Sequence, residues 1–134
     1  MKVIRTTPPS FPRCAPDMPL ESTPGLRWQV LCGDAGHWRC GLYSPPQSDR
    51  DQIVELERHD CPELFLLVEG RLTLVIGDGK GGVREVELAA GSPVLVESPH
   101  SGYCPNGPHT GTAFVVERDE FSTEYRPPSG WKDV

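Results

Sequence analysis

After residue 26, apolar and polar residues alternate along most of the chain, with breaks at short runs of glycine, proline and serine. Alternation with period two is typical of β-strands that have one face on a core and the other toward water. No segment has the 3.6-residue apolar stripe of an amphipathic helix. The pattern predicts strands over residues 27–32, 37–44, 52–59, 63–70, 71–76, 83–88, 92–98 and 112–118.

The segments between these strands are rich in turn-forming residues. The run GDGKGG at 77–82 lies between two alternating segments and predicts the turn of a β-hairpin. Residues 99–111 predict a long turn-rich loop, and RDEFSTEYR at 118–126 predicts a solvated surface segment with at most a short helical turn. Many short strands and almost no helix predict an all-β sandwich or barrel.

The length of 134 residues predicts a single domain. Its first 25 residues are rich in proline, which fixes φ and lacks an amide N–H, so they predict neither helix nor central strand. We interpret residues 1–25 as an extended arm along the domain or against a partner subunit, or else as a partly disordered tail. Residues 26–126 are expected to form the barrel, and residues 127–134 a C-terminal tail.

The charge balance narrows the classes of partner. The chain has 13 Lys and Arg against 19 Asp and Glu, a formal net charge of −6, which argues against a general nucleic-acid binder. No apolar run approaches the roughly 20 residues that span a bilayer, and no signal-peptide pattern is present. Five cysteines without a C-x-x-C pair indicate free thiols. We therefore expect a cytoplasmic protein without nucleic-acid or membrane partners.

Four side chains that could bind a metal stand two residues apart: Glu57, His59, Cys61 and Glu63. If the strand stays regular, all four point to the same side, which in a barrel is the interior. The alternative is that they form only the polar side of an ordinary strand.

The region 55–118 resembles the cupin family of small β-barrels. Glu63 is followed by six residues, LFLLVE, and then Gly70, as in the first cupin motif, and His59 stands at the second histidine of that motif. In the order of the second motif, Gly91 precedes an apolar strand, Pro99 and His100.

The resemblance implies a jelly-roll barrel, the double-stranded β-helix. It also implies a divalent metal that many members hold inside the barrel by three histidines and one glutamate. A donor set of imidazole and carboxylate suits iron, manganese, nickel or zinc, and open coordination positions would permit Lewis-acid or oxygen chemistry. His59 and Glu63 are the ligands that the motif implies here.

The sequence departs from the cupin pattern at two positions. Glu57 stands where the family has its first histidine, which leaves a carboxylate-richer site or abolishes metal binding. The family spacing places the last ligand near residues 102–104, where no histidine occurs. Either His100 is this ligand, or Cys104 is, or there is no third ligand. We favour His100 because imidazole is the commoner ligand for these metals.

Three functions follow as hypotheses. The first is a cupin that binds a divalent metal and acts on a small oxygenated metabolite. The second is a metal-free module that binds or senses a small polar ligand without catalysis. The third is metal-free acid–base catalysis, with His59 as base and Tyr103 as acid. In each case we expect a homodimer that pairs through an edge strand, and an arm such as residues 1–25 could cover the partner's sheet edge.

Overall fold

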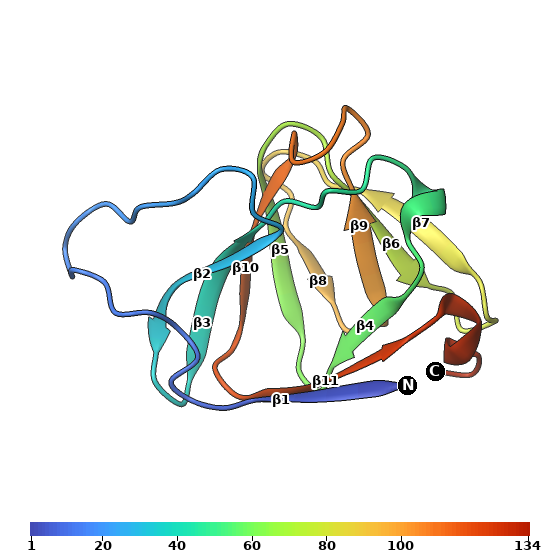
Figure 1. The fold of residues 1–134 in the computed structure, drawn as a ribbon, viewed down its shortest axis with the longest axis horizontal. Helices are drawn as coiled ribbons and strands as arrows, with labels where there is room; N and C mark the ends of the chain where they lie inside the picture. The colour runs from blue at the N-terminus through green and yellow to red at the C-terminus, as the bar shows by residue number, and fades with distance from the viewer.

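The computed structural model describes residues 1–134, which form two antiparallel β-sheets that face each other (Figure 1). The six-stranded sheet has the order β1-β11-β4-β9-β6-β7, and the five-stranded sheet has the order β2-β3-β10-β5-β8. The prediction of an all-β protein is confirmed. The strands are β1 (Lys2–Thr6), β2 (Trp28–Asp34), β3 (Trp38–Tyr43), β4 (Leu56–His59), β5 (Glu63–Glu69), β6 (Thr73–Gly77), β7 (Val83–Glu87), β8 (Val94–Val96), β9 (His100–Tyr103), β10 (Thr112–Arg118) and β11 (Phe121–Arg126).

The main core lies between the two sheets and consists of inward-facing side chains from strands of both sheets. Leu74 and Ile76 enter it from β6, and Phe65 and Val115 enter it from β5 and β10. These four side chains are almost completely buried. The cluster fills one part of the interior with apolar side chains, so the polar inward residues of β4, β9 and β10 gather in the remaining part.

A second, smaller core lies on the other face of the six-stranded sheet. Leu56 and Val75 pack there against Trp131 of the 3₁₀ turn η2 (Pro128–Trp131), and all three are buried. The indole Nε1 of Trp131 donates a hydrogen bond to the carbonyl oxygen of Arg126 at 3.1 Å. The C-terminal tail, residues 127–134, is therefore packed on the barrel through Trp131, because the outward face of β4 is apolar at Leu56.

The first residues of the chain form a strand at the edge of the six-stranded sheet. Lys2–Thr6 form β1, which pairs with β11 over the register Lys2↔Tyr125 to Thr6↔Phe121. The prolines begin only at Pro8, so β1 keeps its amide N–H groups for pairing. Beyond this strand the chain loops outward from the barrel and returns at β2, and residues 12–27 are exposed (Figure 1).

Two further expectations about strands are wrong. Residues 118–126 contain a strand, β11, which pairs with both β1 and β4. The expected loop at 99–111 begins with a strand, β9, which pairs with β6 and β4. Both strands have polar inward residues, so neither shows the apolar alternation that the other strands show. The only helical segments are η2 and the 3₁₀ turn η1 (Arg50–Gln52), and no helix has the length and apolarity needed to cross a bilayer.

Candidate metal centre

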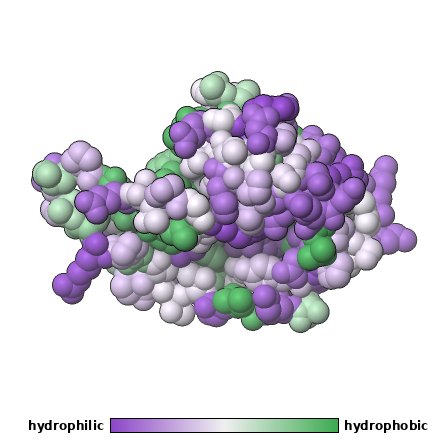
Figure 2. All heavy atoms as spheres, turned by 45° about the horizontal axis from the view of Figure 1, so that its top comes forward, coloured by the Kyte–Doolittle hydropathy of each residue, from purple (hydrophilic) through white to green (hydrophobic).

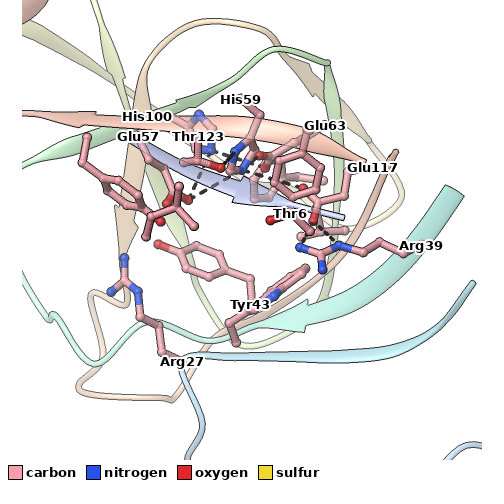
Figure 3. Close-up of a pocket in the computed structure, with 16 residues that line it drawn as sticks. Thr6, Arg27, Arg39, Tyr43, Glu57, His59, Glu63, His100, Glu117 and Thr123 are labelled. Carbon is pink, nitrogen blue, oxygen red and sulfur yellow. Dashed lines mark hydrogen bonds and ion pairs between the residues drawn. The ribbon is translucent and has the colours of Figure 1, made fainter. Parts of the chain in front are cut away.

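A cavity of about 240 Å³ lies between the sheets, with His59, His100 and Glu63 on one side and Tyr43 and Arg27 across from them (Figure 3). Strands of both sheets line it, including β1, which contributes Ile4 and Thr6. Its polar lining consists of Thr6, Arg27, Arg39, Tyr43, Glu57, His59, Glu63, His100, Glu117 and Thr123.

The segment from Glu57 to Glu63 is not one regular strand. β4 ends at His59, a turn containing Cys61 and Pro62 follows, and β5 begins at Glu63 in the opposite sheet. Glu57 and His59 therefore approach the cavity from the six-stranded sheet, and Glu63 approaches it from the five-stranded sheet. Cys61 is buried but does not line the cavity, because the turn interrupts the alternation on which the expected common face depended.

Two imidazoles and two carboxylates meet in the cavity. Glu63 lies between the two histidines: its Oε1 contacts His59 Nε2, and its Oε2 lies 3.3 Å from His100 Nε2. Glu57 Oε1 lies 4.0 Å from His59 Nε2 and 3.9 Å from His100 Nε2. Glu57, His59 and His100 thus offer three ligand atoms within 4.8 Å of one another. His59, Glu63 and Glu117 form a second such group, in which Glu117 Oε2 is 3.7 Å from His59 Nε2.

Both imidazoles are held so that Nε2 faces this cluster. His100 Nδ1 lies 2.9 Å from the carbonyl oxygen of Ser98, and His59 Nδ1 lies 2.7 Å from the hydroxyl of Thr123. A carbonyl oxygen only accepts, so Nδ1 of His100 carries the proton and Nε2 of the neutral ring has a lone pair. That lone pair faces a carboxylate oxygen of Glu63, which is also an acceptor. Histidines that ligate metals are commonly oriented by such a contact at the second nitrogen.

Burial keeps the His59 imidazole neutral. Burial, together with the smaller effects of nearby His100 and Arg39, lowers the pKa of His59 to about 3. A neutral imidazole is the form that binds metals. His59 is therefore available as a ligand at neutral pH without first losing a proton.

An ion pair with Arg39 holds Glu117 at the edge of this cluster. Arg39 donates from Nε and Nη2 to Oε1 of Glu117, each at 2.8 Å. Burial raises the pKa of Glu117, and the guanidinium acts against that rise. The other carboxylate oxygen, Oε2, remains turned toward His59.

Three buried polar atoms of the cavity have no hydrogen-bond partner within the chain: Glu63 Oε1, His100 Nε2 and Tyr43 Oη. Glu63 Oε1 contacts His59 Nε2, but the contact lacks hydrogen-bond geometry. Unpaired buried polar groups are costly and rare in folded proteins. In the neutral His100 ring, Nε2 is an acceptor that faces an acceptor oxygen of Glu63, an arrangement that a bound cation would stabilise.

The structure brings together four of the five ligands predicted from the sequence: Glu57, His59, Glu63 and His100. Cys104, the fifth, is fully buried away from the cavity, where its thiol contacts the backbone nitrogen and oxygen of Gly111 at 3.3 and 3.4 Å. Burial raises the pKa of Cys104, so its thiol keeps its proton.

Tyr103, the acid of the third hypothesis, also lies outside the cavity. Its hydroxyl donates to Glu85 at 2.6 Å.

Sequence reasoning missed six of these cavity residues: Thr6, Arg27, Arg39, Tyr43, Glu117 and Thr123. A local signal was present in two of them, because Arg39 and Glu117 are charged residues in otherwise apolar strands. Their partnership was not visible, since they are 78 positions apart and meet through the pairing of β3 with β10.

No family model and no curated protein sequence matches this chain. Its fold, however, matches solved structures. A cupin-2 domain protein from Shewanella frigidimarina aligns with 68% of this chain and 78% of its own, at a TM-score of 0.50 and 17% identity. Hydroxypropylphosphonic acid epoxidase from S. wedmorenis, in complex with fosfomycin, aligns with 81% of this chain at a TM-score of 0.54 and 20% identity. The DMSP lyase DddQ from Ruegeria pomeroyi aligns with 68% at a TM-score of 0.50 and 16% identity.

These matches establish that the chain has the cupin fold, a jelly-roll barrel of two antiparallel sheets. The aligned region spans 59% of the epoxidase and 45% of the lyase, so both proteins contain parts without a counterpart here. At identities of 20% or less, the likeness concerns the fold. The chemistry has to be argued from the residues of this cavity.

Proposed function

We propose that this cupin-fold chain binds one divalent transition metal ion through His59, His100 and Glu63, with Glu57 as a fourth ligand, and acts on a small oxygenated molecule in the cavity. One observation carries the proposal: His100 Nε2 is buried without a hydrogen-bond partner, and in the neutral ring it is an acceptor that faces a carboxylate oxygen of Glu63 at 3.3 Å. Two facing acceptors repel each other, and a cation between or beside them removes that repulsion.

The donor set fits a metal of the iron, manganese, nickel or zinc type. Imidazole nitrogen and carboxylate oxygen are the ligands that these ions accept, whereas calcium and magnesium prefer oxygen alone. When bound, such an ion supplies a Lewis acid that polarises an oxygen atom of a ligand. The chain itself supplies the rest of the site, since Arg39 holds Glu117 beside the cluster and Thr123 fixes the His59 ring.

Glu57, which stands where the cupin family has a histidine, fits the proposed site as its fourth ligand. Its carboxylate is about equally far from both imidazoles, at 4.0 and 3.9 Å, and it is the most exposed of the four groups, with 31% of its side chain accessible. A small rotation would bring it to a metal held by the other three. Epoxidase structures of the same fold are described with iron(II) and with cobalt(II), which agrees with a metal-holding barrel as a general use of the fold.

Metal stoichiometry tests the proposal. The protein is stripped with a chelator, reloaded separately with Mn(II), Fe(II) without oxygen, Ni(II) or Zn(II), desalted and measured by mass spectrometry of the elements. We expect about one ion per chain for at least one metal, and loss of binding in His59→Ala and His100→Ala. His37→Ala is the matched control, since His37 is exposed in the turn between β2 and β3.

Two outcomes would contradict the metal centre. The first is stoichiometric binding that survives His59→Ala and His100→Ala, and the second is no binding of any metal by the native chain. The second outcome would favour the metal-free binding module, whose own signature is thermal stabilisation by small polar molecules but not by metals. Cys104→Ser is expected to retain metal, because its thiol lies outside the cavity.

A further inference from the structure

We propose that the molecule bound in this cavity is a small monocarboxylate with an apolar substituent, and that Arg27 binds its carboxylate. This inference rests on the proposed metal centre for the charge balance of the site, and on Arg27 and Tyr43 for its geometry. Arg27 immediately precedes β2, and its backbone carbonyl oxygen accepts a hydrogen bond from the Ser44 amide at 2.9 Å. The residue is therefore anchored to the barrel although the segment before it is exposed.

The guanidinium of Arg27 stands at the entrance to the metal-binding cluster. It lies 5.6 Å from the centroid of the Tyr43 ring, close to the hydroxyl that points into the cavity (Figure 3). Arg27 lines both the inner cavity and a neighbouring cavity of about 380 Å³, and the two share Glu57, His100 and Tyr125. Arg27 therefore lies where the two cavities adjoin.

Arg27 differs from the other arginine of the cavity because it has no anionic partner. Its one side-chain hydrogen bond goes to the neutral amide oxygen of Gln47, at 2.7 Å from Nη1. Arg39, by contrast, is paired with Glu117 and with the backbone oxygen of Ser10. A guanidinium has five N–H donors in a fork that matches a carboxylate, so Arg27 has donors left for an anion that enters the cavity.

Tyr43 supplies a second donor in the same place. Its hydroxyl is buried without a partner, and burial raises its pKa, so the phenol keeps its proton and can donate to an oxygen of the ligand. The lining includes three carboxylates, on Glu57, Glu63 and Glu117, and two guanidinium groups. A divalent cation would leave one positive charge in excess, which is complementary to a monoanion.

The size and the apolar wall of the cavity define the rest of the ligand. A volume of about 240 Å³ corresponds to roughly eight water molecules at about 30 Å³ each. Trp28, Phe65 and Phe121 supply apolar lining, and the rings of Phe65 and Phe121 lie 5.7 and 4.6 Å from the imidazoles of His100 and His59. A hydroxy acid with an aromatic or branched substituent satisfies these conditions, with its carboxylate at Arg27 and its hydroxyl oxygen toward the His59 and His100 cluster.

Mandelate and mandelamide form the probe pair, because they differ only in the charged group that Arg27 would recognise. Calorimetry is done on the Zn(II)-loaded chain after removal of free metal, and again on the metal-free chain. We expect native protein to bind mandelate more tightly than mandelamide. Arg27→Gln should weaken mandelate binding about 10- to 100-fold and leave mandelamide unchanged. Arg27→Lys should lie between native protein and Arg27→Gln, because it keeps the charge but loses the fork.

Arg13→Gln serves as the control, since Arg13 is exposed in the segment before β2 and lines neither cavity. Equal binding of the acid and the amide, an equal loss of both in Arg27→Gln, or no detectable binding of mandelate would overturn the inference. Measurements on the Zn(II)-loaded and the metal-free chain distinguish a failure of this inference from a failure of the proposed metal centre. Arg27-dependent acid binding in a chain that takes up no metal would keep Arg27 as the anion site and remove the metal centre. Metal uptake by a chain that binds mandelate and mandelamide equally would keep the metal centre and remove Arg27 as the anion site.

Discussion

The buried pair of Arg39 and Glu117 allows a quantitative test of how the cavity is held. The side chains are 10% and 3% exposed, and the guanidinium also donates to the Ser10 carbonyl oxygen at 3.0 Å. Its carbon lies 4.9 Å from the centroid of the Phe121 ring, so the group is enclosed on several sides. Arg39→Met keeps the length of the apolar stem but removes the charge. It leaves the carboxylate of Glu117 buried without its cation.

Removal of one partner of a buried ion pair costs about 3–5 kcal/mol of folding free energy. We expect that loss for Arg39→Met at pH 8 in the presence of a chelator. Small domains have only about 5–15 kcal/mol in total, so urea denaturation followed by tryptophan fluorescence resolves the change easily. Arg71→Met is the matched control. Arg71 pairs with Glu87 at a similar distance, 2.7 Å, but both side chains are about half exposed, so the expected loss is at most about 1 kcal/mol.

The stability lost in Arg39→Met should depend on pH, because the loss comes from a buried carboxylate. Burial already raises the pKa of Glu117, and loss of Arg39 raises it further. A carboxyl group whose folded pKa exceeds the unfolded value of about 4.3 destabilises the fold above the folded pKa. That cost disappears as the pH falls toward the unfolded value. Arg39→Met should therefore cost less at pH 5 than at pH 8.

Arg39→Met/Glu117→Leu should recover most of the loss, since an apolar pair needs no counter-charge. An equal loss at both pH values, together with no recovery in the double variant, would refute the reasoning.

Three further predictions concern the turns and the histidines. Gly70→Ala should cost far more stability than Gly91→Ala. Both glycines have a positive φ, at 67° and 74°. A Cβ at Gly70 would lie 2.0 Å from a backbone oxygen, whereas a Cβ at Gly91 would meet open space. Comparable thermal shifts would contradict this. Thr123→Val should weaken metal binding about 10- to 100-fold in calorimetry, because His59 loses its orienting partner; unchanged affinity would contradict it. The metal-free native chain should lose stability as pH falls from about 6.5 toward 3, since His59 takes up a proton only on unfolding. His59→Gln should reduce that slope in acid denaturation, and an unchanged slope would contradict the assignment.

The all-β class and most strands followed from the sequence because one face of each strand is apolar. The inward side chains of β6 pack in the main core and give its alternation, whereas β5 was recognised as a short continuous apolar run. The spacing from Glu63 to Gly70 was also visible along the chain. Its physical reason appears only in the fold, where Gly70 has a positive φ and lies against the backbone of Thr110.

β9 and β11 could not be recognised in the same way. Their inward residues include His100 and Thr123, which face the polar cavity and interrupt the apolar alternation. β1 is a short strand at the sheet edge, with Val3 and Ile4 largely exposed, and its pairing with β11 joins residues more than a hundred positions apart. A local pattern contains no information about such pairings, since backbone hydrogen bonds between strands do not depend on side-chain type.

The sequence by itself determined which groups could bind a metal, because His59, Glu63 and His100 stand in recognisable order between apolar strands. Only the tertiary structure decided how they meet. The turn at Pro62 sends Glu63 into the opposite sheet, so the cluster closes across the barrel and not along one strand. The tertiary structure also added Glu117, Arg39 and Tyr43 and excluded Cys104, because the strand pairings that bring cavity residues together are long-range contacts.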